Sequence, residues 1–302
     1  MLAPWVATTL CAAFTQNVRN VLQKRIKERL SIAGATFSRF AFAAPLAAVY
    51  LFTLAIVHKE PIPAPTSTFI VYASVGGIAQ ILANVFLLLA FRHQNFVVAT
   101  TFTKTEAAQT ALLSALLLHE PPGSTALLGI AISFLGVLML AAGRHAVSLK
   151  TLITAWLDKP ALLGLCSGLG LAVAAIGYRG ATLALPEGSA GLRAAATLSF
   201  VTLLQLAVLG AYLAWRERQT IADVLSSVRG AISVGMASAV TSALWFTAIA
   251  MENAAHVRAL GQIELVFAFL SSWLIFKERT RPWEFAGIAT MIGGLVLVIL
   301  GA

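Results

Sequence analysis

Apolar runs of about twenty residues, separated by short polar breaks, follow one another along this sequence. A helix needs about 20 apolar residues to cross a bilayer, whereas a barrel strand needs only about 10 residues of alternating polarity. The pattern predicts ten spans, near residues 3–23, 32–57, 67–91, 96–118, 124–143, 160–183, 190–214, 230–250, 254–276 and 282–301. The expected fold is therefore an all-α integral membrane protein with ten transmembrane helices.

The second half of the chain repeats part of the first half. Residues 95–143 align without a gap to residues 253–301, always 158 positions apart, and 11 of the 49 pairs are identical. The identical pairs include Glu106 with Glu264, and Glu120 with Glu278. The longest polar break, 144–159, falls between the halves. We therefore expect two domains, residues 1–147 and 148–302, each built from five spans.

An odd number of spans in each half reverses its direction across the membrane. The two five-helix halves are therefore predicted to form an inverted repeat. Such repeats are common in secondary transporters, where two similar halves rock around a binding site near the bilayer midplane. The sequence thus predicts a central cavity.

Composition supports a membrane location. The chain is 59% hydrophobic and 11% charged, whereas soluble domains carry about 25% charged residues. The net charge of +9 is explained by basic residues in cytoplasmic loops, so no nucleic-acid partner is expected. The lipid bilayer and a small-molecule substrate are the expected partners, and we expect the chain to function as a monomer.

The loop charges predict an orientation. Fourteen Lys and Arg residues follow the odd-numbered spans, and four lie on the other side. The positive-inside rule places the fourteen in the cytoplasm. Both termini are then expected outside the cytoplasm.

Glycines recur every seven residues in the fifth and tenth spans, at positions 129, 136 and 143 and again at 287, 294 and 301. Seven residues are close to two helical turns, so each trio lies on one face. Small residues let helices approach closely in lipid. We expect these glycines, and the Gly164 and Gly168 pair, to pack helices and not to bind a ligand.

A Glu that closes an apolar helix, a short turn, and then Gly-Ile-Ala with a glycine seven residues on occurs twice, from Leu118 to Gly136 and from Phe276 to Gly294. This pattern resembles the EamA-type repeat of the drug/metabolite transporter superfamily, and the resemblance covers nearly the whole chain. Within the superfamily the chain is most similar to aromatic amino acid exporters of bacterial inner membranes, so the expected location is a bacterial inner membrane with both termini in the periplasm. The resemblance implies a cavity between the halves, alternating access and export.

Two carboxylates and one lysine are predicted at membrane depth, where ionisable groups are costly and usually face a cavity or a partner. Glu106 and Glu264 are either proton or substrate-amine sites, or structural carboxylates at a helix interface. Lys104 either binds a substrate carboxylate or pairs with a neighbouring helix. Arg258, just inside a span end, is expected to snorkel or to attract a carboxylate.

Polar stripes mark three further spans. The substrate-binding candidates on them are Asn17, Asn20, Gln80, Asn84, Ser242 and Trp245. Amide and hydroxyl groups suit the zwitterion of an amino acid, and Trp245 is placed to stack on an aromatic substrate. Interhelical hydrogen bonding is the other explanation for such stripes.

Enzyme chemistry has little support in the sequence. There is no phosphate-binding Walker motif, no second His at metalloprotease spacing after His119-Glu120, and no Gly-x-Ser-x-Gly elbow. No catalytic residue, cofactor or metal site is expected. The predicted function is secondary transport that exports amino acids, aromatic and other neutral ones, or similar metabolites. The alternatives are a multidrug or cationic compound exporter of the same superfamily, an intramembrane enzyme and a channel, and proton coupling stays open.

Overall fold

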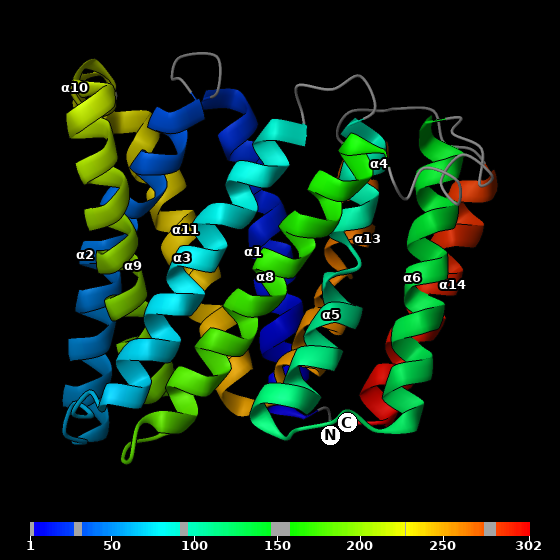
Figure 1. Cartoon of the computed structure of the whole chain (residues 1–302), viewed down its shortest axis with the longest axis horizontal. Helices are drawn as coiled ribbons and strands as arrows, with labels where there is room; N and C mark the ends of the chain where they lie inside the picture. The colour runs from blue at the N-terminus through cyan, green and yellow to red at the C-terminus, as the bar shows by residue number, and fades with distance from the viewer. Residues whose placement is uncertain (1–2, 27–31, 91–95, 146–157, 227, 275–281) are drawn as a thin grey trace. The chain divides into compact units, whose positions relative to one another are not determined.

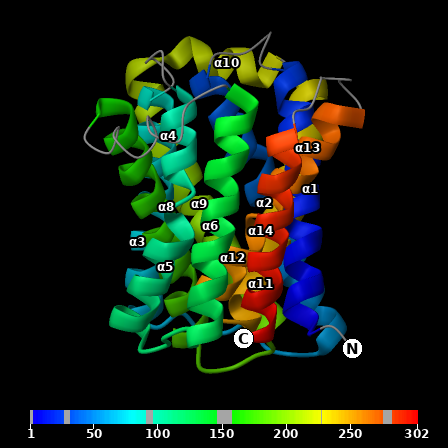
Figure 2. The same ribbon diagram turned by 90° about the vertical axis from the view of Figure 1, so that its right-hand side faces the viewer.

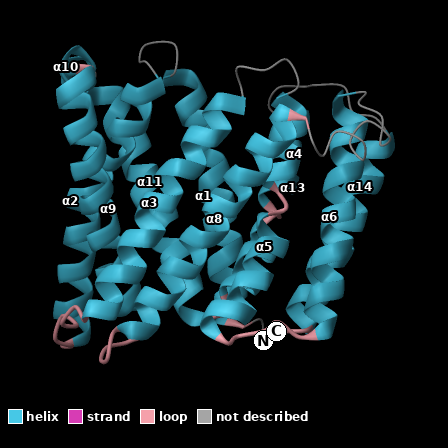
Figure 3. Ribbon diagram, in the orientation of Figure 1, coloured by secondary structure: helices cyan, strands magenta, loops and turns pink. Residues whose placement is uncertain are grey.

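The computed structural model describes residues 3–26, 32–90, 96–145, 158–226, 228–274 and 282–302. These residues form helices joined by loops and turns, with no strand among them (Figures 1 and 3). Seven helical stretches in the described ranges are long and apolar enough to cross a membrane. They confirm an all-helical, multi-pass membrane protein.

Most helices coincide with the predicted spans. In chain order they are α1 (Pro4–Ile26), α2 (Ile32–His58), α3 (Ser67–Ala90), α4 (Phe96–Thr103), α5 (Glu106–Leu113), the π-helix η1 (Ser114–Leu118), α6 (Ser124–His145), α8 (Lys159–Ala184), α9 (Ala190–Arg216), α10 (Arg218–Ser226), α11 (Val228–Met251), α12 (Ala254–Gly261), α13 (Glu264–Leu274) and α14 (Pro282–Leu300). The seven membrane-span candidates lie in α2, α3, α6, α8, α9, α14 and the α12–α13 stretch.

The chain divides into two compact units, each of which takes helices from both halves of the sequence. Unit 1 contains residues 1–77 and 177–251, and unit 2 contains residues 78–176 and 252–302. α3 and α8 each contribute residues to both units.

Unit 1 is held together by apolar contacts and by hydrogen bonds from side chains to helix carbonyls. α1 packs against α11, and α2 packs against α9. Phe37, Leu213 and Val224 form a buried cluster. Gln205 Nε2 donates to the Gly77 carbonyl at 3.1 Å and Ser199 Oγ donates to the Ala47 carbonyl at 2.9 Å. Such bonds satisfy polar side chains that would otherwise be buried at a cost.

In unit 2, α6 and α14 run side by side (Figures 1 and 2). A Cβ atom added to Gly294 would lie 2.4 Å from Ser133 N, and one added to Gly136 would lie 2.5 Å from Met291 N. Five of the six glycines, at 129, 136, 287, 294 and 301, therefore face the backbone of the other helix, which confirms the packing role predicted for them. The surroundings of Gly143 lie outside what the structure describes. A Cβ atom added to Gly164 of α8 would lie 2.3 Å from the Ala99 carbonyl oxygen of α4.

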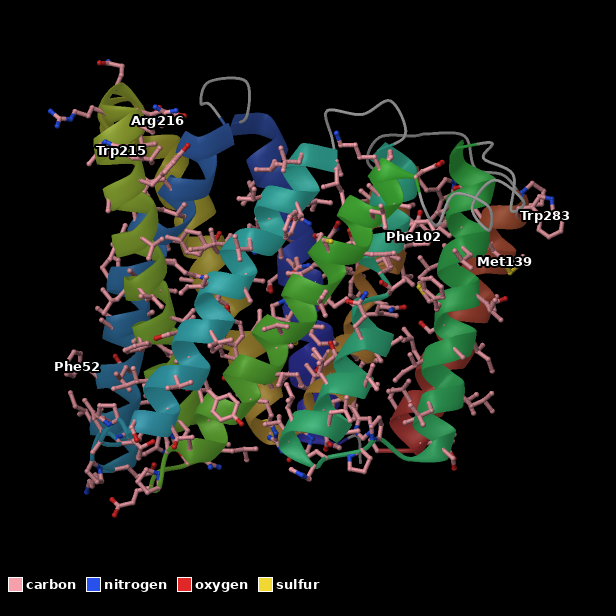
Figure 4. All side chains as sticks on the ribbon, viewed as in Figure 1. Phe52, Phe102, Met139, Trp215, Arg216 and Trp283 are labelled. Carbon is pink, nitrogen blue, oxygen red and sulfur yellow. The ribbon has the colours of Figure 1, made fainter. Side chains whose placement is uncertain are left out.

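Large apolar side chains cover the outer surfaces of the helices. Phe52 is 57% exposed and Trp283 is 66% exposed, and both point away from their ribbons (Figure 4). Trp215, in the last turn of α9, is 78% exposed, and the Arg216 guanidinium lies 5.6 Å from its ring centroid. Exposed apolar surface of this extent marks a membrane or protein interface, and here it suits contact with lipid.

Candidate functional site

Four charged side chains meet in unit 2, where α4 gives way to α5 and α12 gives way to α13. Lys104 forms an ion pair with Glu264, and Arg258 forms an ion pair with Glu106. The charges of Lys104 and Glu264 also interact electrostatically with the Glu106 carboxylate. We call these four residues the four-charge cluster. Its formal charges sum to zero, so neither carboxylate is an isolated ion.

The helix ends place each charge where the backbone favours it. Glu106 and Glu264 are the first residues of α5 and α13, near backbone N–H groups that favour a negative charge. Arg258 lies in the last turn of α12, and Lys104 follows directly after α4. Helix C-termini favour positive charge. Each ion pair therefore joins the end of one helix to the start of another.

The interruptions within these spans were not predicted. The expected spans 96–118 and 254–276 were single helices, but turns at 104–105 and 262–263 divide them, the first visible as a loop in Figure 3. At the first turn, Lys104 N and Thr105 N donate to carbonyls three residues back, which is the tighter 3₁₀ pattern. Thr105 Oγ1 also donates to the Phe102 carbonyl at 2.6 Å. This competition from a side chain is a physical reason for the interruption.

The second interruption has the same backbone pattern. Gln262 N and Ile263 N donate to carbonyls three residues back, at 3.0 Å each. The two turns are separated by the same 158 positions that relate the repeated segments. Lys104 lies in the first turn and Glu106 directly follows it. Lys104 reaches Glu264 of α13, and Glu106 reaches Arg258 of α12.

Gln262 ties the two interruptions together through its amide group. Its Oε1 accepts from Ser133 Oγ of α6 at 2.8 Å, and its Nε2 donates to the Lys104 carbonyl at 3.2 Å. Both Gln262 and Ser133 are buried. We call these two hydrogen bonds the Gln262 brace. The brace fixes the backbone at Lys104 independently of the lysine side chain.

The predicted polar residues on α3 also belong to unit 2. Asn84 Nδ2 donates to the Gln80 carbonyl at 2.8 Å, four residues back along the helix. Both side chains are half-buried. The amide of Asn84 is thus engaged with its own helix, which is one way in which a polar side chain is tolerated at membrane depth.

The remaining predicted residues belong to unit 1. Trp245 is buried and its Nε1 donates to Gln16 Oε1 at 2.8 Å. Asn20 is exposed and its Oδ1 accepts from Arg19 Nη2 at 3.2 Å, while Asn17 and Ser242 are half-buried. The stripe on α11 also includes Ser238 and Thr241, which are fully buried and whose hydroxyls have no hydrogen-bond partner among the described residues.

Sequence reasoning missed the ion pair between Arg258 and Glu106 and the role of Ser133. Arg258 was expected to snorkel or to attract a carboxylate, and its partner is a carboxylate of the protein itself. The partners lie 152 positions apart, so no local spacing indicates the pair. The position equivalent to Arg258 in the first half is Thr100, and the position equivalent to Lys104 is Gln262. A comparison of the two halves therefore identifies the carboxylates, which are identical in both, but not the cations, which are not.

A second polar network fixes the start of α12. Asn253 caps this helix, because its Oδ1 accepts from Ala255 N at 2.8 Å. Its Nδ2 donates to the Glu120 carbonyl at 2.7 Å, and Ser114 Oγ lies 3.0 Å from Asn253 Oδ1. This network ties the turn after η1 to α12, and so positions the helix that carries Arg258.

The described residues hold no group of three or more His, Cys, Asp and Glu that is arranged to bind a metal ion. Cys11 and Cys166 are free and exposed. The chemistry available in the four-charge cluster is ion pairing, hydrogen bonding and proton transfer to a carboxylate.

Comparison with known proteins points to one family. A sequence model of the EamA-like transporter family matches residues 3–142 and 159–300. No curated protein matches the chain in sequence. A solved structure, titled only as the crystal structure of a protein, aligns over 99% of this chain and 97% of its own, with a TM-score of 0.71 and 12% identity. At that identity the likeness concerns the fold alone.

Proposed function

The chain belongs to the EamA-like transporter family, and we propose that it exports neutral amino acids, aromatic ones among them, across a bacterial inner membrane by alternating access. Membership makes it a membrane transporter of small molecules and sets it apart from enzymes. The choice of an amino acid is our own inference, and it rests on the four-charge cluster.

The four-charge cluster supports this inference because it contains four charged groups whose net charge is zero. It offers one ammonium, one guanidinium and two carboxylates at the turns between α4 and α5 and between α12 and α13. A substrate with a net charge would disturb this balance in a region where an uncompensated ion is costly. A zwitterion carries both charges and adds none, so a neutral amino acid fits the balance.

We further propose that ten spans cross the membrane as two inverted five-helix repeats. Seven helical stretches already qualify as spans. α1 and the α4–α5 stretch would complete the first half together with α2, α3 and α6, and α11, with its apolar part Gly235–Met251, would complete the second. The polar side chains of α1, such as Gln16 and Arg19, account for its lower hydropathy.

The proposed orientation has both termini in the periplasm. Its support is the unequal distribution of basic residues, fourteen against four, described above. Seven of the fourteen lie outside the described residues, at Lys27, Arg29, Arg92, Lys150, Lys277, Arg279 and Arg281. A cysteine introduced in the 146–157 segment of a Cys11→Ser, Cys166→Ser variant should be labelled by a membrane-impermeant maleimide only after cells are opened.

The transport proposal is tested in liposomes that contain the purified chain. Labelled phenylalanine and several other amino acids are followed with and without a pH gradient, with protein-free liposomes as the control. We expect saturable phenylalanine flux. Absence of flux for every amino acid would contradict the proposal, and saturable flux of a lipophilic cation in its place would favour the multidrug alternative. A flux that follows the pH gradient would indicate proton coupling, for which Glu106 and Glu264 are the candidate sites.

A further inference from the structure

The two ion pairs of the four-charge cluster follow one design. Each proposed span is divided by its turn into two shorter helices. In each pair, a cation at the end of the first helix of one span contacts the carboxylate at the start of the second helix of the other span. Lys104, after α4, reaches Glu264 of α13, and Arg258 of α12 reaches Glu106 of α5. The pairs therefore cross between the two interrupted spans.

The two ion pairs nevertheless differ in the burial of the carboxylate and in the number of contacts that hold it. Arg258 directs two nitrogens, Nε and Nη2, at one oxygen of Glu106, and the Glu106 side chain is only 9% exposed. A guanidinium fork is pre-organised for such a contact. Opening this pair would leave a buried carboxylate without its principal counter-ion, which is strongly unfavourable.

The pair between Lys104 and Glu264 is more open at its carboxylate. The Glu264 side chain is 19% exposed against 9% for Glu106, whereas the two cations are similarly exposed, at 22% for Lys104 and 21% for Arg258. One ammonium contacts one carboxylate oxygen. An ammonium on a flexible stem can turn to another acceptor more readily than a guanidinium fork. If the pair opens, each charge keeps support from a helix end, since Lys104 follows the C-terminus of α4 and Glu264 lies at the N-terminus of α13.

The Gln262 brace allows the ion pair between Lys104 and Glu264 to open while the backbone at Lys104 keeps its position. Gln262 bonds to the carbonyl of Lys104 and to Ser133 and does not use either charged group. The backbone at both interruptions therefore stays fixed while the lysine side chain moves. A site held in this way can release one ion pair and keep its geometry.

We infer that the pair between Lys104 and Glu264 opens to hold a zwitterionic α-amino acid, with the substrate carboxylate on the Lys104 ammonium and the substrate ammonium on the Glu264 carboxylate. This inference rests on the proposed function and names the groups that select the substrate. The substrate replaces one internal ion pair by two, so every charge is paired before and after binding. The pair between Arg258 and Glu106 stays closed and holds the two spans together.

If the substrate replaces the ion pair between Lys104 and Glu264 in this way, the site should select for both charges of the amino acid. Contacts with the aromatic ring alone would not give this selectivity. Phenethylamine lacks the carboxylate of phenylalanine and would leave Lys104 without a partner. 3-Phenylpropionate lacks the ammonium that would take the place of the Lys104 ammonium at the Glu264 carboxylate. Because an unpaired charge in such a site is costly, both should bind weakly although the aromatic ring is unchanged.

The test is competition against labelled phenylalanine in liposomes. For the wild-type chain we expect unlabelled phenylalanine to compete at least ten times better than either analogue. In Lys104→Gln the advantage of phenylalanine over phenethylamine should fall to within about threefold, and in Glu264→Gln the advantage over 3-phenylpropionate should fall likewise. Lys159→Gln and Glu217→Gln are matched controls at exposed positions and should keep the wild-type ratios.

Equal competition by all three compounds in the wild-type chain would overturn the inference without any variant. So would unchanged ratios in a folded Lys104→Gln variant, with folding checked by the unfolding temperature in detergent. If that variant does not fold, Lys104→Arg keeps the charge and should keep the preference for phenylalanine over phenethylamine. Flux without this selectivity refutes only the inference, whereas absence of amino acid flux refutes the proposed function.

Discussion

Arg258 Nε donates to Glu106 Oε1, and Arg258 Nη2 forms an ion pair with the same oxygen, across 152 positions of sequence. The contact joins the last turn of α12 to the first residue of α5. It encloses one of the most buried carboxylates of the described chain, since the whole Glu106 residue is 7% exposed. A pair in this setting acts as a structural connection between α5 and α12.

Removal of the cation should therefore destabilise the protein more than removal of both charges. Arg258→Met leaves Glu106 buried without its main counter-ion, and we expect a loss of about 3 kcal/mol in unfolding free energy. The double variant Arg258→Met with Glu106→Gln should recover at least half of that loss. The measurement is reversible unfolding in detergent, with Arg218→Met at an exposed helix start as the matched control. A double variant as unstable as the single one would contradict a pairing role.

The glycine seam between α6 and α14 makes a second prediction. A Cβ on residue 294 would lie 2.4 Å from Ser133 N and 2.6 Å from the Gly129 carbonyl, both backbone atoms that cannot turn aside. Gly294→Ala should lower the unfolding free energy by about 1–3 kcal/mol because the helices must separate. The neighbouring Gly293 has nothing within 4 Å of its virtual Cβ. Gly293→Ala should therefore be neutral or slightly stabilising, and equal losses in the two variants would count against the seam.

The seam could be predicted from sequence because close approach of two helices depends on one residue type repeated at one helical interval. The ends of most spans could be predicted for a similar local reason. The interruptions at Lys104 and Gln262 could not, since neither turn contains proline and only Gly261 lies beside one of them. Their cause includes a hydroxyl that competes for the Phe102 carbonyl, which an apolar pattern does not reveal.

The candidate site was predicted in part. The 158-residue offset identified Glu106 and Glu264, and membrane depth singled out Lys104. The choice of partners lies in the tertiary packing of helices far apart in sequence, so the pairs themselves did not emerge. Arg258 occupies a position where the first half has Thr100, and a comparison of the two halves by identity passes over it.

The Gln262 brace supports a third prediction. Ser133→Ala removes the donor that satisfies Gln262 Oε1 and leaves a buried acceptor, which should cost about 1–3 kcal/mol. Adding Gln262→Met removes the orphaned amide, and part of the loss should return. The measurement is again unfolding in detergent. Ser124→Ala, at the exposed start of α6, is the matched control and should change stability by less than about 0.5 kcal/mol.

A double variant no more stable than Ser133→Ala would show that the loss does not come from the unsatisfied amide. Transport assays on the same variants provide a second measurement. Because the brace holds the backbone at Lys104, its removal should weaken phenylalanine binding while the preference for phenylalanine over phenethylamine stays, since the lysine charge is untouched.

The last prediction concerns pH and lies outside the membrane-spanning segments. Glu60 follows α2, and its Oε2 accepts from Ser189 N at 2.8 Å, at the N-cap of α9. The hydrogen bonds from Ser189, backbone first, lower the pKa of the Glu60 carboxyl below its usual value. A carboxyl with a lowered pKa in the folded state stabilises the fold when it is ionised. This contribution is complete above the usual carboxyl pKa of about 4.3 and is lost as the pH falls through the lowered value.

Glu60→Gln should therefore lower the unfolding temperature at pH 7, and the difference from wild type should shrink as the pH falls below about 4.3. Unfolding temperatures between pH 7 and pH 3 measure this directly. Glu217→Gln, an exposed carboxylate at the end of α9, is the matched control. A Glu60→Gln deficit that stayed constant across this range would mean that the lost stability comes from shape or amide geometry, because only an ionised carboxylate ties its contribution to the proton concentration.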